Sequence, residues 1–272
     1  MRFPRSTLLQ VLACIVLVIT VSSTVFAKDK KRTSSRVVEP EFIDQEWNEL
    51  PKTYHPTHPK AAADWLNAIV SSEPFPDQFS TPNEIARRDE SIRNRITHKG
   101  TIGILIEAEM NEHGRIACEL RYSLNEETLS YSLGSHWYTE YKYSSRQTDN
   151  HRKVILESKF SDGRDSVGQN AFGAKVKVSR STYKDISVAA KETTGVGITS
   201  ISPEKARMVV PRLKCLVLFS PAPPFVLQQR DTKAASFDNP EQVSTEDIVL
   251  FGRIENIWLI DSASRQVVAK QR

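Results

Sequence analysis

The sequence predicts an α+β fold with N-terminal helices, a central antiparallel β-sheet, and a C-terminal helix plus a closing β-hairpin. Apolar residues recur at helical spacing before residue 100, and from Thr101 onward they alternate with polar ones. Near residue 203, a serine and a proline mark the start of another helix. Hydrophobic residues make up 39% of the chain, which is enough for a buried core and excludes a disordered protein. We therefore expect a single α+β domain over residues 60–272.

The chain begins with a targeting signal. Arg2 and Arg5 precede an uncharged, largely apolar run that ends at Ala27, and charged residues follow at once. This pattern predicts a signal peptide over residues 1–27, cleaved after Ala27, and therefore a periplasmic or secreted protein. The alternatives are an uncleaved segment that anchors the protein in a membrane, and lipidation at Cys14.

Removal of this segment leaves a nearly neutral chain. The full sequence has 37 basic and 33 acidic residues; without Arg2 and Arg5 there are 35 basic residues and a net charge of +2. This balance provides no electrostatic basis for binding nucleic acid. The basic cluster from Lys28 to Arg36 is interpreted as a solvated linker, with contact to anionic lipid as the alternative. It opens an irregular, proline-rich arm over residues 28–59, with candidate docking side chains at Phe42, Ile43 and Trp47.

Two cysteines, Cys118 and Cys215, remain in the mature chain. An even number of cysteines in an exported protein favours a disulfide. Closing a loop of this length would stabilise the fold by roughly 4–5 kcal/mol in the chain-entropy model. Both cysteines also lie within apolar strand patterns, so two buried free thiols are the alternative.

Three helices are predicted. The first covers Pro59–Ser71, with Ala62, Trp65, Leu66 and Ile69 at helical spacing. The second covers Asn83–Thr97 and has a thin apolar face, which is typical of a helix at the surface. The third starts at Pro203 with Ser202 as its N-cap and ends near Pro211.

Strict alternation predicts a β-hairpin after Thr101. A three-residue loop from Glu112 to Gly114 places all apolar side chains on one face. The pairs in this register are Met110–Ile116, Ala108–Cys118, Ile106–Leu120 and Ile104–Tyr122. The polar face then carries Glu107 directly opposite Glu119.

The remaining strands complete the predicted sheet. They are expected at Leu129–Leu133, Trp137–Tyr143, Lys153–Phe160, Ala174–Val178, Ile186–Ala190 and Cys215–Phe219. Residues 221–225 contain three prolines, so we expect an extended segment that cannot join a central strand. Residues 228–245 are expected to form a polar loop, and Asp247–Ile260 with Gln266–Lys270 a closing hairpin.

Glu107 and Glu119 are the candidate catalytic residues. Two carboxylates in one cross-strand pair repel each other, and they are retained where they share a proton or bind a cation. The alternative is that Arg121, or a lysine from the next strand, neutralises the pair at the surface.

His55 and His58 are weak candidates for a metal site. Their spacing suits zinc or copper, but the surrounding sequence offers no further ligands. The chain has no P-loop, no G-x-G-x-x-G and no G-x-S-x-G motif, so no cofactor is expected. These absences favour a non-enzyme, and a hydrolase whose catalytic residues are scattered in the sequence is the alternative.

An aromatic strand is the candidate binding surface. Trp137, Tyr141 and Tyr143 share one face, from which they can stack on a sugar or grip a protein. Ordinary sheet packing is the alternative. The segment Pro221–Phe225 is similarly a rigid docking element or a packed crossover loop.

The sequence thus favours an exported, non-enzymatic binding module for an envelope protein or a glycan. The alternative function is a secreted or periplasmic hydrolase that uses Glu107 and Glu119 as its carboxylate pair.

Overall fold

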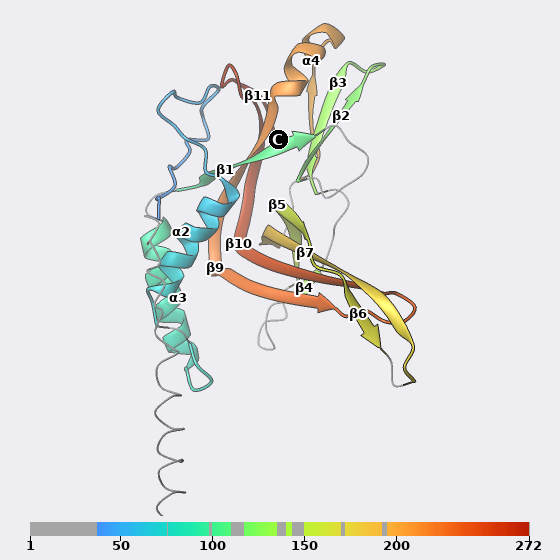
Figure 1. Cartoon of the computed structure of the whole chain (residues 1–272). Coiled ribbons are helices and arrows are strands. Elements are labelled where there is room, and N and C mark those ends of the chain that lie inside the picture. Colours follow the sequence, from blue (N-terminus) through green and yellow to red (C-terminus); the bar gives the residue numbers. More distant parts are fainter. Residues whose placement is uncertain are drawn as a thin grey trace, which may run out of the picture. The chain divides into compact units, whose positions relative to one another are not determined.

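The fold is built on two long antiparallel strands, β9 (Leu213–Lys233) and β10 (Glu241–Asp261), shown in orange and red in Figure 1. The structure is a computed structural model. It describes residues 37–74, 76–97, 100–109, 117–134, 140–142, 150–169, 172–191 and 195–271. The predicted signal peptide over 1–27, its cleavage after Ala27, and the basic cluster up to Arg36 lie outside these ranges.

The sheet runs in the order β4-β5-β7-β10-β9-β1-β2-β3-β8, with β11 paired to β10 and β6 paired to β7. Most neighbours are antiparallel, but β7 runs parallel to β10, and β1 meets β2 in parallel. The other strand bounds are β1 Ile102–Glu109, β2 Cys118–Ser123, β3 Thr128–Leu133, β4 Glu140–Lys142, β5 Asn150–Asp162, β6 Ser166–Gln169, β7 Lys175–Ala190, β8 Gly197–Ser200 and β11 Val267–Lys270.

The predicted α+β class is wrong, because the protein is mainly β. Eleven strands and only three short α-helices occur within the described ranges. The strands near residues 176 and 188 are one strand, β7, and most of the expected loop over 228–245 belongs to β9 and β10. These polar ends pair through backbone hydrogen bonds, which need no apolar alternation and therefore leave no periodic signal.

The three described helices lie where the sequence predicts them: α2 at Pro59–Ser71, α3 at Pro82–Thr97 and α4 at Pro203–Val209. Helix α2 packs against β9, β1, β10 and β7, and its buried stripe includes Trp65 and Leu66. Figure 1 shows α2 and α3 beside β9. The Ser202 side chain accepts from the Lys205 N–H at 3.4 Å, which confirms the predicted cap. None of the described helices is long and apolar enough to cross a membrane.

The predicted hairpin register is wrong. Strand β1 pairs antiparallel with β9, from Ile102 opposite Phe219 to Glu107 opposite Lys214. It meets β2 only at its end, in parallel, where Ala108 lies opposite Cys118 as predicted. The predicted loop Glu112–Gly114 and the Met110–Ile116 pair lie outside the described residues. Antiparallel pairing of β2 is made with β3 instead. The same alternation suits either partner, because a period of two identifies a face and not a neighbour.

Strand β9 is central in the sheet even though it contains the proline segment, so the expectation that this segment cannot join a central strand is wrong. The prolines occupy a break in register: Pro221 faces Gly252, and pairing resumes at Val226 opposite Leu250. Proline has no N–H to donate, and the break removes the need for one. A side chain at Gly252 would meet the Ser220 carbonyl oxygen at 2.3 Å, so the close approach at the break requires glycine.

A disulfide joins Cys118 of β2 to Cys215 of β9, with the Cα atoms 6.3 Å apart. Both cysteines are fully buried. The bond lies where β1 passes from pairing with β9 to pairing with β2. It therefore ties strands β2, β3 and β8 to the central pair, and the free-thiol alternative is not what the structure contains.

The described part of the N-terminal arm, residues 37–58, packs on the sheet. Ile43, Leu50 and Tyr54 are buried with side chains of β9 and β10. Phe42 makes an edge-on contact with Trp65 at 6.4 Å, and Trp47 one with Tyr54 at 5.2 Å. The three predicted docking side chains therefore all contact the fold.

Acid should weaken the turn between β10 and β11. Burial of the Asp261 carboxyl opposes ionisation, but hydrogen bonds from the Ala263 N–H and the Ser264 hydroxyl, both 3.0 Å, and Arg212 at 3.1 Å outweigh it. The pKa of Asp261 is therefore below its usual 3.8. Its stabilising contribution is complete above pH 3.8 and is lost as the pH falls through the lower, folded value.

We expect Asp261→Asn to lower the free energy of unfolding by about 1 kcal/mol at neutral pH, and by less as the pH falls through the folded pKa. Urea unfolding at several pH values measures this. Asp238→Asn, at an exposed position in the β9–β10 turn, is the control. A difference from wild type that stays constant with pH would contradict the assignment.

Reduction of the disulfide should lower the free energy of unfolding by roughly 4 kcal/mol, because a loop with a sequence separation of 97 is released. Urea unfolding with and without a reductant measures the loss. The double variant Cys118→Ala with Cys215→Ala should be destabilised and should not respond to reductant. If the urea midpoint of the wild-type chain is the same with and without the reductant, the cysteines are free thiols.

Candidate functional site

A groove of about 490 Å³ lies on the sheet face beyond the start of α2. Its size is within the usual range for pockets that bind small molecules or peptide side chains. Its lining comes from α2, β5, β7, β9 and β10: Lys60, Glu157, Lys159, Lys184, Asp185, Ile186, Gln228, Gln229, Arg230, Glu246, Asp247 and Ile248. Strand pairing brings these distant segments together, so no local motif marks the site.

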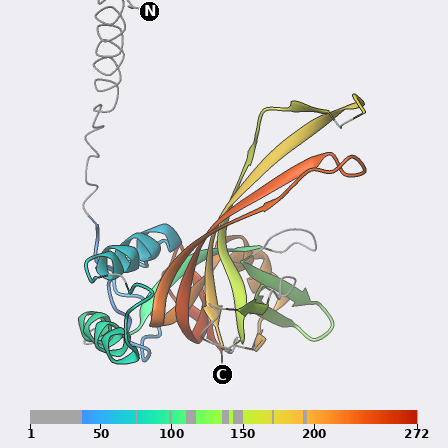
Figure 2. The same ribbon diagram turned by 90° about the horizontal axis from the view of Figure 1, so that it is seen from below.

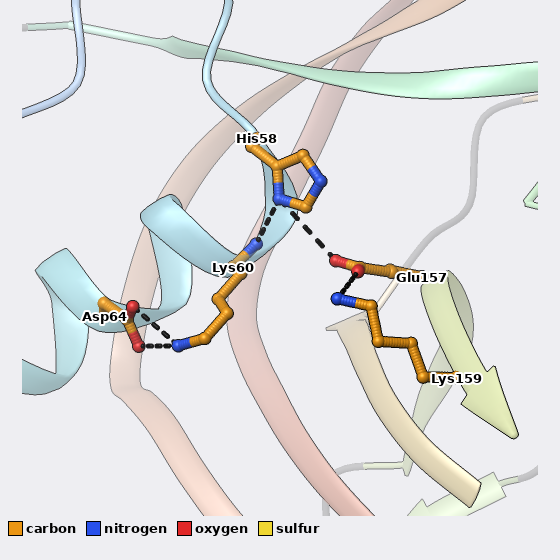
Figure 3. Close-up of polar contacts among 5 residues, drawn as sticks. All are labelled: His58, Lys60, Asp64, Glu157 and Lys159. Carbon is orange, nitrogen blue, oxygen red and sulfur yellow. Dashed lines mark hydrogen bonds and ion pairs between the residues drawn. The ribbon is translucent and has the colours of Figure 1, made fainter. Parts of the chain in front are cut away.

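The first turn of α2 forms one end of this groove. Pro59 occupies the start of the helix, where no N–H is needed, and the preceding His58 is the N-cap. The His58 Nδ1 accepts from the Lys60 N–H at 3.2 Å. Asp64 lies one turn further along the helix, and its two carboxylate oxygens accept hydrogen bonds from the Lys60 ammonium at 2.7 and 2.8 Å (Figure 3).

Glu157 on β5 faces this turn (Figure 3). A β-bulge between Ile155 and Glu157 sets Glu157 opposite Ile186, on the groove face. Lys159 contacts Glu157 Oε1 at 2.8 Å, while His58 Nδ1 is 3.6 Å from Oε2. The Glu157 side chain is only 16% exposed.

The imidazole of His58 has two mutually exclusive roles. A neutral ring with an unprotonated Nδ1 can accept from Lys60 and cap α2. A protonated Nδ1 can only donate, and Glu157 is then its acceptor. The start of the helix and the Glu157 carboxylate thus compete for one atom.

The groove lining is balanced in charge. Its cations are Lys60, Lys159, Lys184 and Arg230, and its carboxylates are Glu157, Asp185, Glu246 and Asp247. Lys184 is 3.4 Å from Glu246, but Arg230 has no ion-pair partner in the described ranges. Ile186 and Ile248 provide an apolar surface between these charges. The combination suits a ligand with both carboxylate and apolar groups.

Glu107 and Glu119 are not a cross-strand pair. Glu107 faces Lys214 of β9, with Nζ and Oε1 2.5 Å apart. Glu119 is 3% exposed and contacts Arg121 at 2.6 Å. The predicted pair is therefore absent, and the surface alternative does not describe Glu119 either, because its side chain is buried.

The two histidines have separate contacts. His55 lies 3.4 Å from Glu41, while His58 caps α2. Among the residues that the structure describes, no group of three or more histidine, cysteine, aspartate or glutamate side chains is arranged to hold a metal ion.

The predicted aromatic surface stays a prediction. Trp137 and Tyr143 lie outside the described residues. Tyr141 lies in β4, opposite His151 of β5.

A buried polar cluster, whose Asp185 and Asp247 also line the groove, was missed by the sequence reasoning. Asp185 and Asp247 face each other on parallel strands and are 3% and 5% exposed. Ser158 donates to Asp185 at 2.6 Å, Ser187 donates to Asp247 at 2.8 Å, and Lys153 pairs with Asp247. One feature of the sequence could have indicated these buried aspartates: each of them directly precedes an apolar stretch, in Asp185–Ala190 and in Asp247–Phe251.

The cap on α2 can be tested by substitution. We expect His58→Ala to lower the free energy of unfolding by about 1 kcal/mol, because the Lys60 N–H loses its acceptor. His58→Asn should retain wild-type stability, since asparagine is a good N-cap but cannot form the ion pair with Glu157. Urea unfolding measures both. Equal losses in the two variants would show that the imidazole acts through Glu157 instead.

Comparison with known proteins adds no relative: no protein-family model, no curated protein and no solved structure matches this chain.

Proposed function

We propose that this protein is an exported, non-enzymatic binding module that holds a partner protein in the groove between α2 and strands β5, β7, β10 and β9. The observation that carries the proposal is the mixed lining of that groove, with four cations, four carboxylates and two isoleucines. A partner with carboxylates would pair with Arg230 and compete with Glu157 and Glu246 for the lysines. Such binding weakens as salt rises.

Export is supported by the disulfide. Disulfides persist in oxidising compartments and are rare in the cytosol, so the Cys118–Cys215 bond fits a secreted or periplasmic protein. The proposal includes a signal peptide, because an uncharged, largely apolar run of residues ends at Ala27. In an envelope, the groove would meet other exported proteins.

The hydrolase alternative has less support. The proposed carboxylate mechanism requires two carboxyl groups that flank one substrate site. Glu107 and Glu119 instead contact Lys214 and Arg121, respectively.

Site-specific crosslinking in the native envelope tests the proposal. A photo-crosslinking residue at Lys184, in the groove, should capture one dominant protein, whereas the same residue at the exposed Lys205 of α4 should not. Lys184→Glu should reduce the yield about tenfold from a neighbouring groove position, because it reverses one contact charge. Lys205→Glu is the matched control.

Three outcomes would change the conclusion. Equal capture from Lys184 and Lys205, or none from Lys184, would contradict a binding groove. Capture that is lost in Tyr141→Ala but kept in Lys184→Glu would move the binding surface to β4.

A further inference from the structure

One edge of β9 is open beyond the hydrophobic core. β1 pairs with β9 only between Lys214 and Phe219. From Gln228 to Lys233, β9 pairs with β10, and no described strand pairs with its other edge. In Figure 2 this end of the β9–β10 pair projects away from α2 and α3. Every second residue of the stretch therefore directs its N–H and C=O groups outward.

This edge is accessible. Of the six residues from Gln228 to Lys233, only Gln229 is half-buried and the others are exposed. An open edge strand is a template for pairing with another chain. Charged residues discourage indiscriminate pairing at an edge, and this stretch carries Arg230, Asp231 and Lys233. Of these three, Arg230 lines the groove, and it favours a partner with a carboxylate at that position.

The edge and the groove share residues. Gln228 and Arg230 line the groove and face Ile248 and Glu246 across the β9–β10 pair. Residues opposite each other in a ladder share a face, so a strand added beside β9 would place alternate side chains on the groove side. A carboxylate opposite Arg230 would lie next to a cation that has no other partner within the described ranges.

We propose that the partner binds by strand addition: an extended acidic segment of another protein pairs with β9 along Gln228–Lys233. Its backbone takes up the free hydrogen-bonding groups of the edge, and a carboxylate on the groove face pairs with Arg230. This mode rests on the proposed function, because it specifies how the same groove is occupied. Arg230, which has no ion-pair partner within the described residues, favours an acidic occupant.

The test uses an end-blocked peptide of about nine residues, alternating glutamate and valine, in two versions that carry N-methyl groups at either the odd or the even positions. In an added strand only one set of N–H groups faces β9. We expect one version to bind about tenfold more weakly than the unmethylated peptide, and the other to bind equally well. Fluorescence anisotropy with the full mature chain measures this.

Changes in the protein provide an independent readout. Arg230→Glu should weaken the unmethylated peptide about tenfold, and Lys205→Glu should not. Peptide binding should also slow amide hydrogen exchange at alternate residues from Gln228 to Lys233 in the wild-type chain, which requires no variant to fold.

The outcomes separate the two proposals. Peptide binding with equal tolerance of both methylated versions would overturn strand addition while leaving a binding groove. Absence of peptide binding together with absence of capture at Lys184 would overturn both. Concentration-dependent dimers that are lost in Arg230→Glu would show that a second copy, and not a partner, occupies the edge.

Discussion

The antiparallel pairing of β9 with β10 is the constraint on which the rest of the structure depends. Each strand has 21 residues, and their ladder runs from the turn at residue 240 to Asp261. One side of the pair receives β1, and the other receives β7 and then β5. Residues 222–225 of β9 have no regular partners in β10, so the ladder is interrupted at the prolines. This break divides the ladder into a buried half, which the helices cover, and an exposed half.

The groove forms at the boundary between these halves. Helix α2 begins at Pro59, so the sheet beyond it is uncovered, and the bulge in β5 places Glu157 at that boundary. Strand ends that leave a core bury little apolar surface, and their stability comes from backbone pairing with neighbours. Such strands are suited to accept a further strand, which is why the groove and the free edge are interpreted as one surface.

The buried polar cluster around Asp185 and Asp247 helps to fix how the strands are aligned. Asp185 and Asp247 are partnered by Ser158, Ser187 and Lys153, as buried charged groups must be. A one-residue slip of β7 would carry Asp185 and Ser187 to the other face, which would separate Asp185 from Ser158 and Ser187 from Asp247. Hydrogen bonding across β5, β7 and β10 thus favours the observed register of the strands that form the groove floor.

Local features of this protein could be predicted from its amino-acid order: the three helices, the cap at Ser202, the hairpin that closes at β11, and the two cysteines able to bond. Each of these depends on residues close together in the chain, or on a chemistry that only a few residue types possess. Tertiary structure alone decided that β1 pairs with β9 and that Glu107 faces Lys214. It also decided that β9 continues through its prolines as a central strand. Alternation records which face a strand buries but not which strand lies beside it, so the pairing, the mainly β class and the groove emerge only when distant segments meet.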